Sequence, residues 1–171
     1  MNSRNILYIA VSFVFYILIQ VMFFKSLVLF DVAFCFVYIA FVLMLPVQIS
    51  TVSLILAGFA SGLVIDVFYD SLGINAAAIT FIAFLRPVWM RMIPPRVGYE
   101  DVNLPTLKTF GFTWFMAYSL PLIFIHHMII FFMEAGGVFM FLFTMSKVIS
   151  STIFTFFIVV LAQYMFYKAS E

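Results

Sequence analysis

The residues of this sequence most able to do chemistry lie between Gly58 and Asn75. Gly58, Gly62 and Asp66 follow one another at intervals of four, so a helix would carry two glycines and a carboxylate on one face. Glycines at this spacing let a second helix approach closely, and an acid in or near a membrane must face protein, water or a partner group. We interpret this stripe as a contact face, either for a partner helix or within the protein itself.

Three roles are open for Asp66 at this stage. It could bond backbone groups of the following turn and the start of the next helix, form a docking surface for another membrane protein, or belong to a proton- or solute-handling site. Asp70 opens an Asp-Ser-Leu-Gly sequence that ends at Gly73, which is ordinary turn chemistry before a helix. We predict Asp70 to be an exposed loop or cap residue.

His126 and His127 invite a metal or proton-relay hypothesis. Neighbouring helix positions point about 100° apart, so the two rings cannot share one ligand, and the nearest acid is Glu134. We predict packing or interfacial histidines near the outer face. Ser61 has small neighbours, as in intramembrane proteases, but these histidines are expected at another span's outer end, away from it. No enzyme, metal or cofactor is predicted.

The composition predicts a membrane protein. Of 171 residues, 67% are hydrophobic and 9% charged, and the mean hydropathy is +1.25, whereas soluble domains carry roughly a quarter charged residues. The net charge of +1 gives no reason to expect nucleic acid as a partner. The lone cysteine, Cys35, excludes an intrachain disulfide and is predicted to be a buried thiol.

The apolar runs predict an all-α integral membrane protein with about six transmembrane helices in a single polytopic domain over 1–171. The charge-free stretch after Val32 is too long for one helix and is broken at Pro46. The run at 73–90 is short enough to be tilted or partly re-entrant, and 138–146 is predicted to be interfacial. The expected spans are 5–24, 32–46, 51–67, 73–90, 109–133 and 148–167.

The charges near the span ends predict the orientation. Six spans put both termini and the polar loop 91–108 on one side, which carries Arg4, Arg86, Arg91, Arg96, Lys108 and Lys168. The opposite side carries only Lys25 and Lys147. The positive-inside rule therefore places both termini and the loop in the cytoplasm, with Arg86, Arg91 and Arg96 near lipid headgroups or a partner.

The central segment resembles that of a known family. Gly62-Leu-Val-Ile-Asp66, followed by Leu72-Gly73-Ile-Asn75-Ala-Ala-Ala, is similar to the pattern of the bacterial rod shape-determining MreD family, as is Leu45-Pro46. Gly62, Asp66 and Gly73 match that pattern, and Asp70 and Asn75 match it less closely. The family supplies no catalytic residues to transfer.

The resemblance implies a non-enzymatic component of the bacterial inner membrane that works in cell elongation. Its expected partners are MreC, the cytoskeletal protein MreB, and the peptidoglycan-synthesising pair of RodA and its transpeptidase; a homo-oligomer is also left open. The resemblance further implies a helical core similar to the substrate-binding components of vitamin transporters. A solute-binding transporter subunit is therefore the alternative function, although few polar side chains are available to bind a solute.

Overall fold

The computed structural model describes residues 3–96, 98–100, 103–138 and 140–166, which are mostly helical. Four helical segments are long and apolar enough to cross a bilayer: Ile6–Phe24, Thr51–Tyr69, Leu107–Glu134 and Phe141–Met165. The prediction of an α-helical membrane protein is confirmed at this level.

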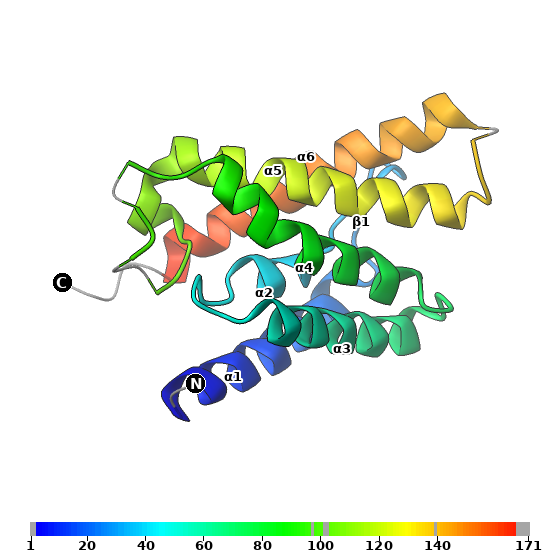
Figure 1. Cartoon of the computed structure of the whole chain (residues 1–171). Coiled ribbons are helices and arrows are strands. Elements are labelled where there is room, and N and C mark those ends of the chain that lie inside the picture. The colour runs from blue at the N-terminus through cyan, green and yellow to red at the C-terminus, as the bar shows by residue number, and fades with distance from the viewer. Residues whose placement is uncertain (1–2, 97, 101–102, 139, 167–171) are drawn as a thin grey trace.

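The described residues form five long helices, the short helix α2, one π-helical turn and two very short strands (Figure 1). Helix α4 packs between α3 and α5, α5 packs on α6, and α1 lies against α2 and α3. The elements are α1 (Ser3–Ile19), the π-helical turn η1 (Gln20–Phe24), β1 (Val28–Leu29), β2 (Ala33–Phe34), α2 (Ile39–Leu43), α3 (Thr51–Tyr69), α4 (Ile74–Met92), α5 (Leu107–Glu134) and α6 (Phe141–Phe166).

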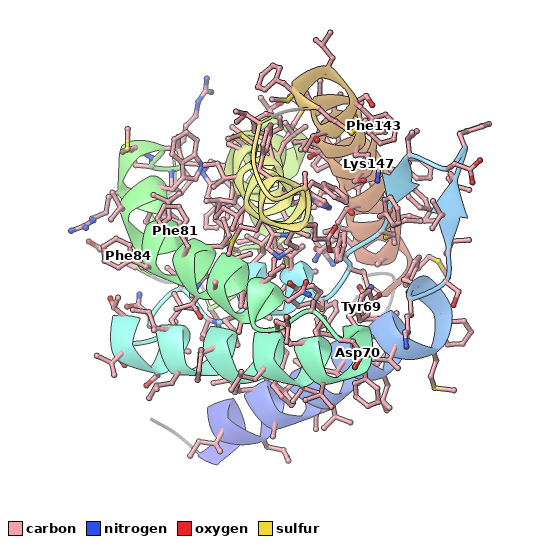
Figure 2. The ribbon with its side chains drawn as sticks, turned by 90° about the vertical axis from the view of Figure 1, so that its right-hand side faces the viewer. Tyr69, Asp70, Phe81, Phe84, Phe143 and Lys147 are labelled. Carbon is pink, nitrogen blue, oxygen red and sulfur yellow. The ribbon has the colours of Figure 1, made fainter. Side chains whose placement is uncertain are left out.

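The connections gather at two ends of the molecule. At the loop end, segment 46–50 lies against segment 93–106, and the backbone N–H of Val47 donates to the carbonyl of Asn103 at 2.9 Å. At the hairpin end lie the β1–β2 hairpin and the turns at 70–73 and 135–138 (Figure 1). Figure 2 views the molecule from the hairpin end, with Tyr69 and Asp70 at the end of α3 and Lys147 on α6.

The predicted second helix over 32–46 is wrong. Between the hairpin and Pro46, only the five residues of α2 are helical, and residues 35–45 are buried throughout. The segment instead runs beside α6, because the N–H of Phe34 and that of Phe36 bond side chains one turn apart on that helix. Non-helical backbone at membrane depth is tolerated where protein surrounds it, and this segment forms the core.

Helices lie at the other five predicted positions, with differences at their ends. Helix α4 covers residues 74–90 of the predicted span 73–90. Its polar residues lower its mean hydropathy, so it is not one of the four candidate membrane-crossing helices. Helix α5 has a break at Gly111, where φ is +82°. Residues 138–146 were predicted to form a separate interfacial segment, but from Phe141 onward they are the first turns of α6. The turn between α5 and α6 is made by Gly136 and Gly137, which both have positive φ. Residues 167–171, including Lys168, lie outside the described residues.

Candidate functional site

Asp66 caps the N-terminus of α4. Its Oδ1 accepts the backbone N–H of Asn75 at 3.0 Å, and its Oδ2 accepts that of Ala76 at 2.9 Å. These are the second and third residues of α4, whose N-cap is Gly73 with φ +91° and no side chain to do this work. The carboxylate also faces the positive end of the helix dipole. Of the three roles open to Asp66, the structural one fits this geometry.

The glycine stripe meets the same helix. A Cβ at Gly62 would lie 2.7 Å from the backbone nitrogen of Ala76 and closer still to its Cα, so α4 touches α3 backbone to backbone. Gly58 is less tight, with a Cβ 3.1 Å from that of Ala83. The stripe is therefore a contact face, but α4 occupies it, and it does not face outward to a partner.

A buried chain of polar side chains continues from Asp66 across the core. The amide nitrogen of Asn75 donates to Asp66 Oδ1 at 3.2 Å, which turns the amide oxygen of Asn75 toward Tyr38. The Tyr38 hydroxyl donates to that oxygen at 3.0 Å and lies 2.8 Å from Nε2 of His126. Because the tyrosine proton is used, Nε2 of His126 must carry the proton of its ring and donate to Tyr38.

Both histidines are fully buried, so of the two predicted roles they take the packing one and not the interfacial one. Nδ1 of His127 lies 2.7 Å from the carbonyl of Ile123, and its Nε2 lies 3.3 Å from Thr155 Oγ1. Nδ1 of His126 has no hydrogen-bond partner within the part of the chain that the structure describes. The rings also pack against Phe36 and Phe131, which supports the packing interpretation of the pair.

Other polar side chains satisfy the backbone of the non-helical segment. Gln20 spans it by donating to the carbonyl of Cys35 at 2.9 Å and accepting the N–H of Tyr38 at 3.2 Å. From α6, Ser151 accepts the N–H of Phe34 and Thr155 that of Phe36. Each unsatisfied backbone group in hydrocarbon would cost several kcal/mol. These residues were not among the predicted site residues. Hydroxyl and amide groups inside an apolar helix indicate that a neighbouring backbone needs hydrogen-bond partners.

Arg86 does not belong to the basic loop. It is 1% exposed, and its guanidinium donates to the Tyr118 hydroxyl at 2.6 Å and to the carbonyl of Leu45 at 2.5 Å. Tyr118 in turn donates to the carbonyl of Leu43 at 2.8 Å. The pair thus holds the carbonyl end of α2, where a positive charge is favourable. The predicted headgroup contact of Arg86 is therefore wrong.

The remaining predicted residues lie at the two ends. Arg91 and Arg96 are exposed at the loop end, and Asp70 is an exposed C-cap of α3 with φ +53°, as predicted for a cap residue. Cys35 is buried, as predicted. In the loop, burial raises the pKa of Tyr99 to about 12, and its hydroxyl donates to the carbonyl of Met90.

Removing the Tyr38 hydroxyl tests the buried chain. Tyr38→Phe leaves both the Asn75 oxygen and His126 Nε2 without their partner, so we expect the free energy of unfolding to fall by about 2–4 kcal/mol. Unfolding in mixed micelles by a denaturing detergent measures this, and ¹⁵N NMR of the wild type should show Nε2 of His126 protonated. The matched control is Tyr164→Phe, since Tyr164 is 60% exposed on α6. Equal effects of the two changes would contradict the assignment.

Comparisons with protein-family models, with curated proteins and with solved structures found no match. The fold and the site together define an α-helical membrane protein in which buried polar side chains form hydrogen bonds mainly with the protein's own backbone.

Proposed function

We propose that the protein is a non-enzymatic membrane scaffold that recognises the transmembrane helix of another protein. The observation that carries this proposal is a shallow groove of about 560 Å³ on the outer surface of the α3–α4 pair. Gly73, Ala76 and Ala77 form its floor. Small residues of this kind let a second helix approach its partner closely in a bilayer.

The walls of this groove suit an apolar helix. Phe59 and Leu63 line it from α3, and Phe81 and Phe84, marked on α4 in Figure 2, line it from the other side. All four are at least 43% exposed. Thr80 also lines the groove, and its hydroxyl oxygen is buried without a hydrogen-bond partner among the described residues.

The use of the polar side chains supports a scaffold over a catalyst. Asp66 and Asn75, the strongest candidates from the sequence, bind the start of α4 and each other. Arg86 binds the end of α2. Residues with these bonds stabilise the packing of the helices, and the packing of α3 on α4 forms the groove.

The resemblance to the MreD family makes this scaffold a component of the bacterial cell-elongation complex. In this proposal the chain crosses the inner membrane six times, with the buried segment as its second crossing. Both termini and the exposed Arg91 and Arg96 face the cytoplasm. The helix in the groove belongs to an MreC-like protein, and MreB, RodA and its transpeptidase join the assembly.

The alternative, a solute-binding subunit of a vitamin-type transporter, would need polar groups that converge on a solute. Asn75, His126 and His127 are each at most 1% exposed and bind protein atoms, which favours the scaffold. Thermal stabilisation by a vitamin in a panel of such compounds would favour the transporter instead.

Filling the groove tests the scaffold. Ala77→Trp puts an indole on its floor, and we expect about a tenfold loss of the co-purified MreC-like protein from native membranes, as a loss of about 1.4 kcal/mol gives. The control is Val67→Trp, at a position on α3 that is 77% exposed and outside the groove. Unchanged co-purification and normal cell shape with Ala77→Trp would refute the proposal.

A further inference from the structure

A second groove, on the other side of the molecule, separates α1 from α6. Helix α1 packs on α2 and α3, and a space of about 430 Å³ remains between it and α6. Val37 and Met44 of the buried segment form its floor, and Phe15 and Leu161 stand at its sides, 38% and 44% exposed. Because both helices are among those that can cross a bilayer, this groove opens sideways to lipid.

Part of the polar lining of this groove gathers at the loop end, where Tyr8 lies near the start of α1, Thr106 caps α5 and Gln163 lies near the end of α6. Ser12 and Tyr16 lie farther along α1. At the hairpin end the lining is apolar, with Ile19 on α1 and Phe24 on η1. The groove is therefore more polar at the loop end than at the hairpin end.

Gln163 is the polar group best placed to bind something in this groove. Its side chain is 9% exposed, yet its amide has only weak partners. Nε2 donates to the thioether of Met44 at 2.9 Å, and Oε1 accepts the N–H of Leu107 at 3.4 Å. Sulfur is a weak acceptor and 3.4 Å is long for such a bond. An amide this deep in an apolar site gains from a better partner.

The volume of the groove indicates what could lie in it. A helix about 10 Å across with a pitch of about 5.4 Å fills roughly 420 Å³ in a single turn. The space of about 430 Å³ would therefore hold about one helical turn, which is too little for a helix that crosses the bilayer but suits one thin acyl chain.

We infer that this groove binds one acyl chain of a membrane phospholipid, with the ester carbonyl accepting a hydrogen bond from the Gln163 amide. The chain lies along α1 toward Phe24, and the headgroup remains at the loop end. The site is separate from the α3–α4 groove of the proposed function and does not depend on it.

Photolabelling with a defined lipid tests this site. The whole protein is placed in vesicles of phosphatidylethanolamine and phosphatidylglycerol that contain phosphatidylethanolamine with a diazirine on one acyl chain. After irradiation, we expect labelled peptides from α1 and the second half of α6 to exceed those from the exposed face of α3 about tenfold, the ratio that a preference of about 1.4 kcal/mol gives.

Two variants and a control complete the experiment. Ala162→Trp fills the groove and should abolish the enrichment, and Gln163→Leu should lower it about threefold without adding bulk. Ile153→Trp, at a position on α6 that is 61% exposed and outside the groove, should leave it unchanged. Even labelling of all exposed helices that neither variant alters would overturn the inference. Cross-links from the groove to a second copy or to another protein, with no lipid label, would overturn it as well.

Discussion

Replacing Gly62 with alanine is expected to lower the free energy of unfolding by about 3 kcal/mol and to reduce the amount of protein in the membrane. The added methyl group would lie 2.7 Å from both the Ala76 nitrogen and Ile79 Cγ2. Backbone atoms cannot rotate away as a side chain can, so α3 and α4 must separate along their length. Unfolding in mixed micelles and quantitative blotting of membranes measure the two effects.

Gly58→Ala is the matched control, one turn earlier on the same face. Its methyl group would lie 3.1 Å from Ala83 Cβ, and a shift of a few tenths of an ångström relieves that contact. Alanine also favours a helix over glycine by about 1 kcal/mol, which offsets the crowding. We expect a change of less than about 1 kcal/mol. If the two alanine variants were equally stable, the close approach at Gly62 would be disproved.

The spacing of this stripe predicted a contact face but could not identify its partner. Intervals of four residues place Gly58, Gly62 and Asp66 on one side of a helix whatever packs there. The Asp-Ser-Leu-Gly turn makes α4 antiparallel to α3, and a turn this short brings the next helix back onto the nearest face. Short connections therefore favour an intramolecular partner, and the length of this turn is the feature of the sequence that indicates it.

The mostly non-helical conformation of the buried segment 35–45 could not be predicted, because hydropathy indicates that a segment is shielded from water but not which backbone conformation it has. A continuous apolar run has the same hydropathy whether it forms a helix that faces lipid or an extended segment surrounded by protein. The distinguishing signal lies elsewhere in the chain, in Gln20, Ser151 and Thr155, which bond the peptide groups that a helix would have satisfied itself.

Arg86 was misplaced for a related reason. A positive charge close to the end of an apolar run usually marks the membrane surface. Here the charge is buried inside the protein, where Arg86 donates to the carbonyl of Leu45 and Tyr118 donates to that of Leu43. The free carbonyl groups that bind Arg86 exist because the segment is not a continuous helix. If the segment is assumed to be a helix, its carbonyls are already paired and nothing predicts a buried arginine.

Replacing Asp66 with alanine is expected to have the largest effect, a loss of about 4 kcal/mol in the free energy of unfolding. Three donors lose their acceptor together: the backbone N–H groups of Asn75 and Ala76 and the Ser71 hydroxyl. The Asn75 amide loses one of its two bonds and keeps the one to Ser71 Oγ. Each buried donor left unsatisfied costs about 1–3 kcal/mol, and part of this is recovered as the first turn of α4 loosens. Hydrogen exchange should show that loosening at residues 74–77.

Asp70→Asn is the control for this prediction. It removes an acid four residues away on the same helix, while asparagine keeps the left-handed backbone of the C-cap at low cost. Because Asp70 is exposed, we expect a change of less than about 0.5 kcal/mol. If Asp66→Ala left stability and exchange at the start of α4 unchanged but stopped binding of an MreC-like protein, the carboxylate would serve the partner and not the fold. The assignment of Asp66 to the cap would then be wrong.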